Sequence, residues 1–195
     1  MRNGDALVLV DVQRDFCRGG ALEVPDGDAV VAVLNRYIEG FKAAGLPIFA
    51  TRDWHPRKTR HFKAFGGVWP PHCIQGSEGA MFHPQLGVYE GIVIVSTGTS
   101  PDEDGFSGFD GRSENGALLA ELLRERNVQR LFVGGLATDY CVKATVVDGL
   151  KEGFNVVLIK DAVRGVDLKP GDSAAAIDVM IRAGATIHSG PPDEC

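Results

Sequence analysis

Residues 130–150 read RLFVGGLATDYCVKATVVDGL, an apolar run followed by a Gly-Gly turn and then by apolar residues at helical spacing. A short run rich in Val, Leu and Phe is typical of a strand that is buried on both faces. Apolar residues recur from Val142 through Val146 to Leu150, and a glycine, which commonly follows a helix C-terminus, stands at position 153. The stretch therefore predicts a strand, a tight turn and a helix.

The same alternation recurs along the whole chain. Strands that alternate with helices form right-handed βαβ crossovers, and these build a parallel sheet with helices on both faces. We therefore predict an α/β fold in three layers (α/β/α), with a mostly parallel, six-stranded sheet and a single domain over residues 1–195. The other strands are predicted at residues 6–11, 47–51, 92–97, 156–161 and 186–188, and the other helices at residues 30–41, 118–123 and 174–181.

The composition narrows the function classes. The chain has 20 Lys and Arg against 26 Asp and Glu, a net charge of −6, and these charges are interspersed. Because no basic stripe could follow a phosphate backbone, we expect a small-molecule ligand and no nucleic-acid partner. The apolar stretch from Ala6 to Val10 is too short for a signal-peptide core or a membrane span. We therefore expect a cytoplasmic protein without a membrane partner.

Two long connections interrupt the alternation, at residues 52–86 and 98–113. Structureless loops of such length inside a compact domain usually carry function. Both follow the carboxyl ends of predicted strands, and in open α/β sheets the ligand crevice lies outside those ends. We therefore expect one pocket to receive Asp11, the segment 53–55, Thr97 and the turn after Gly135.

The first connection gathers one carboxylate and three of the chain's five histidines within twenty residues. The Asp-x-His spacing at 53–55 lets two ligands leave an extended segment on the same side. Imidazole and carboxylate together suit a borderline divalent ion such as Zn²⁺, Mn²⁺ or Fe²⁺. The alternative is a polar loop that carries histidines by chance or for surface hydrogen bonds. The candidate ligands are Asp53, His55, His61 and His72.

Cys141 stands in the first turn of the helix after the Gly-Gly turn. The positive end of the helix dipole favours a thiolate there, and the unpaired N–H groups of that turn can hold an oxyanion. Asp11 follows the first apolar run, where a carboxylate is costly unless it is needed, for example as a general base for Cys141. The alternatives are a small buried hydrophobe for Cys141 and a capping residue for Asp11.

Five motifs together resemble the nicotinamidase/pyrazinamidase family of the isochorismatase-like cysteine hydrolase superfamily. They occur in that family's order and approximate spacing and span almost the whole chain. The motifs are Asp-Val-Gln-x-Asp-Phe at 11–16, Asp-x-His at 53–55, Trp-Pro-x-His-Cys at 69–73, Ser-Gly-Phe at 107–109 and Gly-x-Ala-Thr-Asp-x-Cys at 135–141.

The resemblance implies hydrolysis of nicotinamide to nicotinate and ammonia, a step of NAD salvage. Cys141 would attack the carboxamide and form a thioester, and Asp11 would carry the proton. The resemblance also implies an oxyanion hole made by the N–H groups of Ala137 and Cys141, with a cis peptide between Leu136 and Ala137. The resemblance is also compatible with assembly of this protein into a homo-oligomer. It further implies metal ligands Asp53, His55, His61 and His72, a zinc ion with iron or manganese as alternatives, and pocket walls Phe16, Trp69 and Tyr140.

Two positions depart from the family pattern: Tyr140 stands where a His is frequent, and the serious departure is at Thr97. Thr97 stands where the family carries a catalytic lysine, whose charge would favour the ionised carboxylate and thiolate. Three alternatives follow: a hydrolase that works without the lysine, a hydrolase of another small amide or N-carbamoyl compound, or a weakly active or silent metal-binding relative. Redox signalling through the thiol would need a resolving cysteine, and the sequence indicates none. Residues that could supply a compensating cation are Arg14, Arg52, Lys143 and Lys160.

The remaining cysteines and histidines receive simpler interpretations. The four cysteines form no Cys-x-x-Cys pair, which argues against a disulfide framework and a zinc ribbon. Cys73, beside a candidate ligand, is either structural or an extra ligand, and Cys195 is expected to be exposed. His83 and His188 have no ligand spacing, so we assign them no functional role.

Overall fold

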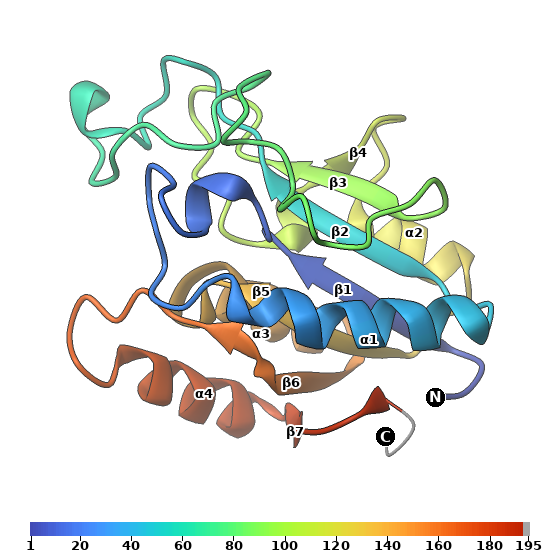
Figure 1. Ribbon diagram of the computed structural model, residues 1–195. Helices are drawn as coiled ribbons and strands as arrows, with labels where there is room; N and C mark the ends of the chain where they lie inside the picture. The colour runs from blue at the N-terminus through green and yellow to red at the C-terminus, as the bar shows by residue number, and fades with distance from the viewer. Residues whose placement is uncertain (193–195) are drawn as a thin grey trace.

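A seven-stranded sheet runs through the middle of the computed structural model, which describes residues 1–192 (Figure 1). Cys195 lies outside the described residues. The strand order is β4-β3-β2-β1-β5-β6-β7, and every neighbouring pair is parallel except β3 with β4. The strands are β1 (Asp5–Val10), β2 (Ile48–Asp53), β3 (Val93–Thr97), β4 (Arg112–Ser113), β5 (Arg130–Leu136), β6 (Asn155–Arg164) and β7 (Thr186–His188).

The predicted α/β fold with a mostly parallel sheet is confirmed, but the predicted count of six strands is wrong. The additional strand is β4, which pairs antiparallel with β3 at the sheet edge. It consists only of Arg112 and Ser113, so no apolar run or alternation marks it in the sequence. Its existence depends on pairing with a strand some fifteen residues away, which local periodicity does not report. The single domain over residues 1–195 stays a prediction.

Within residues 1–192, four α-helices cover the two faces of the sheet, and the side chains of β1 alternate between the two cores. Leu7 and Leu9 pack in the core under α1, whereas Val8 and Val10 pack in the core under the other three helices. This alternation is the period of two that a strand imposes. The helices are α1 (Ala29–Ala43) on one face, and α2 (Leu119–Glu125), α3 (Lys143–Lys151) and α4 (Asp172–Ala183) on the other (Figure 1).

The parallel strands bring their carboxyl ends to one edge, and the long loops lie beyond that edge (Figure 1). Asp11 follows the end of β1, and the register pairs Asp53 at the end of β2 with Thr97 at the end of β3. β5 also ends there, next to β1, where Gly135 opposes Val10. The edge therefore collects the residues that the sequence marks as functional.

Gly135 is needed for the contact between β1 and β5. Its φ is +134°, a backbone conformation that residues other than glycine rarely adopt. A Cβ atom at this position would also collide with the backbone of Val10. The register between β5 and β6 also shifts between Val133 and Gly135. Glycine thus allows the strand that leads to Cys141 to lie close beside the strand that leads to Asp11.

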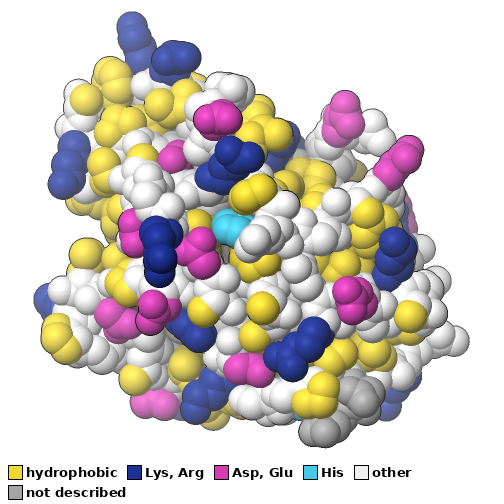
Figure 2. All heavy atoms as spheres, in the orientation of Figure 1, with side chains coloured by type: hydrophobic (Ala, Val, Ile, Leu, Met, Phe, Trp, Pro, Cys, Tyr) yellow, Lys and Arg dark blue, Asp and Glu magenta, His cyan; other side chains and the backbone are white. Residues whose placement is uncertain are grey.

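The surface carries mixed charge on the face shown in Figure 2, where acidic and basic side chains are interspersed among apolar ones. None of the helices within residues 1–192 combines the length and the apolar character that crossing a membrane requires.

Candidate active site and metal centre

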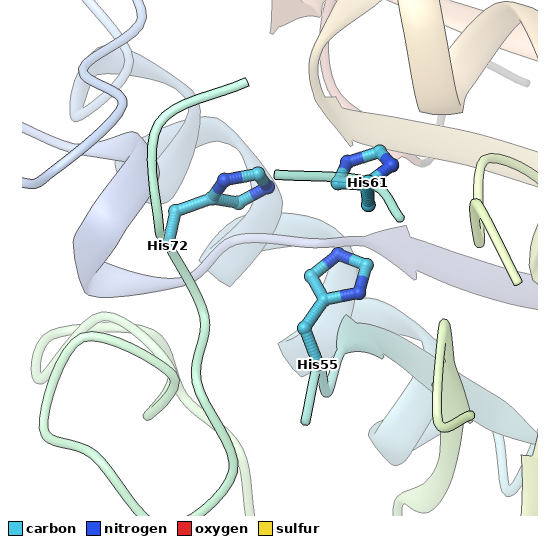
Figure 3. Close-up of side chains that lie close together, drawn as sticks. All are labelled: His55, His61 and His72. Atoms are coloured by element: carbon cyan, nitrogen blue, oxygen red, sulfur yellow. The ribbon is translucent and has the colours of Figure 1, made fainter. Parts of the chain in front are cut away.

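Three histidines from the loop after β2 point their rings toward one another (Figure 3). One ring nitrogen from each of His55, His61 and His72 lies within 4.8 Å of the others, and all three side chains are buried. Three imidazoles that converge away from water are expensive to bury unless they share a partner. The cluster therefore has the arrangement of a metal centre.

Each of these rings has an oxygen atom beside its Nδ1 atom. The Nδ1 of His72 is 2.8 Å from the carbonyl oxygen of Pro70, and that of His55 is 3.2 Å from the carbonyl oxygen of Gly98. The Nδ1 of His61 is 3.5 Å from a carboxylate oxygen of Asp104. A proton on each Nδ1 satisfies these contacts and leaves Nε2 free to bind an ion, as is usual for metal-binding histidines.

Asp53 completes the centre from the end of β2. Its Oδ2 is 3.4 Å from Nε2 of His55 and 3.6 Å from Nε2 of His72. Burial opposes its ionisation, but the two nearby histidines outweigh burial and lower the pKa of the Asp53 carboxyl. The buried amide of Gln13 holds the backbone of Asp53 through two hydrogen bonds of 2.8 Å, one to each backbone polar group.

These residues fit a borderline divalent ion. The Nε2 of His55 is buried and has no hydrogen-bond partner among residues 1–192, although the Asp53 carboxylate lies nearby. Burial and the two neighbouring histidines lower the pKa of His61 to about 4, so its imidazole is neutral at pH 7, the form that binds metals. A set of three imidazoles and one carboxylate is suited to zinc, manganese or iron.

A second cluster of reactive groups lies beside this centre. One ligand-type atom from each of Asp11, Asp53 and Cys141 lies within 4.8 Å of the other two, and all three residues are buried. The Cys141 thiol and the Asp11 carboxylate are thus buried neighbours. Thr51, on the neighbouring strand β2, donates its hydroxyl proton to Asp11 Oδ1 over 2.6 Å. The thiol and its candidate base therefore lie close together, as proton transfer between them requires.

The expectation that the Cys141 thiol is poised for ionisation stays a prediction, and the surrounding protein groups oppose it. Burial, together with the charges of Asp11 and Asp53, raises the pKa of the thiol well above its ordinary value. Burial and the charge of Asp53 likewise raise the pKa of Asp11. The sequence showed the nearby helix end but not the two carboxylates that outweigh it.

The backbone around Cys141 also differs from the predicted α-helical turn. The peptide between Leu136 and Ala137 is cis, as the family resemblance implied. Thr138–Val142 then forms a π-helical turn, in which the N–H groups of Tyr140 and Val142 both donate to the carbonyl oxygen of Ala137 at 3.1 Å, before α3 begins. Ala137 and Cys141 both line the pocket.

Thr97 lies among the carboxylates and does not supply a charge. Its hydroxyl is 3.1 Å from Asp53 Oδ1 and 3.2 Å from the carbonyl oxygen of Arg52, and its single proton can be donated to one of them at a time. No Lys or Arg is among the pocket-lining residues of the described chain. Arg14 pairs with exposed Glu78, and Arg52 lies over the ring of Trp54. Lys143 lines a separate surface groove, and Lys160 is exposed on β6.

Aromatic side chains wall the pocket above both clusters. Phe16, Trp69 and Tyr140 all line it, and the rings of Trp69 and Tyr140 meet edge to face with centroids 4.9 Å apart. Phe16 contacts the ring of His72, and Trp69 stacks on His61. The pocket is therefore shaped for a flat ring next to the metal centre and the thiol.

The comparison with protein families decides where this site belongs. A family model described as the isochorismatase domain matches residues 5–190. The chain belongs to the isochorismatase family.

Individual family members agree with this assignment over nearly their full lengths. A nicotinamidase of Escherichia coli is 42% identical over 201 residues, which cover 94% of each chain. The structure of a pyrazinamidase of Pyrococcus horikoshii in complex with zinc has a TM-score of 0.88 and 45% identity, and it covers 96% of this chain and 99% of that one. The structure of PnC1 from L. infantum in complex with nicotinate has a TM-score of 0.85 and 35% identity, and the match covers 96% of this chain and 93% of that chain.

Several residues of this isochorismatase-family site were not found by sequence reasoning. Phe106 lines the pocket and contacts both His61 and Tyr140, and Leu22 and Val24 line it from the loop before α1. Gln13 was inside a quoted motif, but its role depends on Asp53, 40 residues away. Phe106 directly precedes the Ser-Gly-Phe motif, so a quoted motif lay beside it in the sequence, whereas no such motif lay beside Leu22 or Val24.

The remaining cysteines and histidines lie outside the centre. Cys73 is buried and is not part of the three-histidine group, and its backbone N–H donates to Asp15. His83 lies 3.2 Å from Asp28 and close to Cys17, and its Nδ1 accepts from the backbone N–H of Gln85. His188 packs against Tyr37. The structure thus adds a His83–Asp28 pairing that sequence spacing did not indicate.

Proposed function

We propose that this protein is a nicotinamidase-type amidohydrolase that converts nicotinamide to nicotinate and ammonia through a thioester on Cys141. The observation that carries the proposal is the Asp11–Cys141 pair, buried beside a three-histidine centre in an aromatic pocket. The near full-length similarity to nicotinamidases and pyrazinamidases supports this class of enzyme. Such an activity would return nicotinamide to NAD synthesis, with a small molecule as its partner.

The chemistry needs only groups that lie together in the pocket. Asp11 accepts the thiol proton as Cys141 Sγ bonds to the carboxamide carbon, and the same proton leaves with the amide nitrogen as ammonia when the C–N bond breaks. Water then attacks the thioester, and Asp11 takes a proton from it. The C–S bond breaks, the proton on Asp11 returns to the sulfur, and the product leaves as nicotinate after its carboxyl proton passes to solvent.

We assign the oxyanion hole to the backbone N–H groups of Ala137 and Cys141. Both residues border the pocket at the turn between β5 and α3, where the backbone changes direction. Rigid N–H donors stabilise the negative oxygen of a tetrahedral intermediate because they need no reorganisation during the reaction.

We assign the metal site to Asp53, His55, His61 and His72, and zinc is the proposed ion, with iron or manganese as alternatives. When bound, the ion supplies a Lewis-acid site for the pyridine nitrogen of the substrate. Phe16, Trp69 and Tyr140 line the pocket and would hold the flat ring next to Cys141.

Thr97 keeps two alternatives open. Among the described residues, no Lys or Arg lines the pocket to offset the charges of Asp11 and Asp53. A hydrolase of another small amide or N-carbamoyl compound, or a silent metal-binding relative, is therefore tested in the same experiment. The proximity of Asp11 and Cys141 favours an active enzyme, because a silent protein has no chemical need for a buried acid–thiol pair.

The experiment measures ammonia release from nicotinamide by zinc-loaded protein, with metal content determined on the same samples. Cys141→Ala should lose at least about 10³-fold of the rate, as expected for a nucleophile. Cys17→Ala, which removes a buried thiol outside the pocket, should keep it. The intact mass of the acid-quenched enzyme should show a nicotinoyl adduct that Cys141→Ala lacks.

The outcomes separate the alternatives. Turnover that survives Cys141→Ala would remove the thioester mechanism. Silence with nicotinamide but Cys141-dependent ammonia release from an N-carbamoyl amine would favour the second substrate class. Silence and no adduct with either substrate, in metal-loaded protein, would favour the silent relative.

A further inference from the structure

The three candidate metal-binding histidines are oriented by different kinds of oxygen. His55 and His72 donate from Nδ1 to backbone carbonyl groups, those of Gly98 and Pro70. His61 faces a side chain, because its Nδ1 lies 3.5 Å from Oδ1 of Asp104. His61 is therefore the candidate ligand whose orientation depends on a side chain, and a mutation can change that side chain.

We propose that Asp104 is a positioning residue that sets the affinity of the metal centre by orienting His61. The inference rests on the metal site of the proposed function and adds a residue to it. Asp104 belongs neither to the three-histidine group nor to the pocket lining, so it would act through the imidazole of His61, with which its carboxylate pairs. A carboxylate in this place also makes the imidazole a more basic ligand, which a neutral carbonyl does less strongly.

The carboxylate is held in place from its other oxygen. Oδ2 of Asp104 is 3.3 Å from Nη2 of Arg60, the residue next to His61. One carboxylate thus bridges two consecutive residues of the histidine loop. Because Arg60 constrains the second oxygen, the first is directed at His61 with less freedom than a lone surface aspartate would have.

The two loops are also joined through their backbones at this point. The N–H of Arg60 and the hydroxyl of Thr59 both donate to the carbonyl oxygen of Pro101, over 3.0 and 3.1 Å. The same second loop supplies the Gly98 carbonyl that holds His55. The loop after β3 therefore presents oxygen atoms to two of the three histidines, although it contributes no candidate ligand itself.

Asp104 lies at the surface, so it can be substituted without disturbing the core. The Asp104 side chain is 47% exposed, whereas that of His61 is 4% exposed. The carboxylate reaches inward from the surface to the edge of a buried ring. Replacing it should leave the sheet and both cores intact and change only how His61 is held.

The test compares zinc affinity, measured by competition with a chromophoric chelator, among variants at position 104. Asp104→Ala removes both charge and acceptor and should weaken zinc binding about 10- to 100-fold. Asp104→Asn keeps a neutral acceptor and should show a smaller loss, and Asp104→Glu should recover most of the affinity. The matched control is Asp102→Asn, an exposed acid on the same loop, which should bind zinc like the parent.

A second measurement separates positioning from general loop stability. The visible absorption of the cobalt-substituted protein reports ligand geometry, and we expect Asp104→Ala to change its band positions while the metal-free unfolding temperature stays the same. Unaltered affinity and spectrum in both Asp104→Ala and Asp104→Asn would overturn the inference.

His61→Ala distinguishes that failure from failure of the proposed metal site. If His61→Ala weakens zinc binding but the Asp104 variants do not, Asp104 has no positioning role and the metal site stands. If the parent protein binds no zinc, or His61→Ala binds it equally well, then the proposed ligand set is wrong and the inference falls with it.

Discussion

At the scale of single residues, the environment of Cys141 is set by charge more than by its place in a turn. Burial raises the pKa of its thiol, and the nearby carboxylates of Asp11 and Asp53 raise it further. Thr97 hydrogen-bonds to Asp53 without adding positive charge. An ammonium group at position 97 would favour the ionised forms of the neighbouring acid and thiol.

We therefore expect Thr97→Lys to lower the pKa of the Cys141 thiol. In chelator-treated protein, the parent's alkylation by iodoacetamide should keep rising above pH 9, because a raised thiol pKa moves thiolate formation to higher pH. The lysine variant should reach its plateau at lower pH and gain at least about tenfold in kcat/KM, since one pKa unit corresponds to about 1.4 kcal/mol.

The control for length and hydrogen bonding is Thr97→Met, which also loses the contact with Asp53 but adds no charge. It should alkylate like the parent. An equal shift in both variants would attribute the effect to repacking and refute the electrostatic account.

At the scale of elements, the contact between β1 and β5 positions the acid and the thiol relative to each other. Gly135 allows the contact because a side chain at its position would meet the backbone of Val10. At the end of β5 the peptide between Leu136 and Ala137 is cis, and Cys141 lies in the π-helical turn that follows. The distance between the catalytic groups thus depends on how closely two central strands pack.

Gly135→Ala should be strongly destabilising, by more than about 3 kcal/mol, or should prevent folding. Gly153→Ala is the matched control: its φ is also positive, at +90°, but the space around it is open. That variant should lose only about 1–2 kcal/mol, the usual cost of a side chain in this backbone region. Urea unfolding of both proteins measures the difference, and similar losses would show that steric contact with Val10 is unimportant.

At the scale of the whole molecule, the candidate metal centre lies where two long loops outside the sheet contact each other. The loop after β2 carries the three histidines, and the loop after β3 contacts them through Gly98 and Asp104. An ion bound there would connect both loops to the sheet through Asp53 at the end of β2. Binding that occurs only in the folded state stabilises it.

Metal removal should accordingly lower the thermal stability of the protein. Zinc at 100 times its dissociation constant contributes about 2.7 kcal/mol, which corresponds to roughly 5–10 °C in Tm for a chain of this size. Thermal unfolding followed by circular dichroism, with zinc and with chelator, measures the shift. His83→Ala should retain it, because His83 lies outside the three-histidine group, and His61→Ala should lose most of it. An identical Tm in both conditions would contradict a structural contribution from the ion.

The sequence by itself determined the α/β fold and the strand ends that carry Asp11, Asp53 and Cys141, because alternating periodicities and buried apolar runs are local properties of the chain. Only the tertiary structure revealed the pairing of β4, the contact of Thr97 with Asp53, the carboxylate of Asp104 beside His61 and the raised pKa of Cys141. Each of these depends on side chains that are distant in sequence and meet only when the loops pack. Periodicity reports which face of an element is buried, but the electrostatic character of the site comes from the groups that share that buried space.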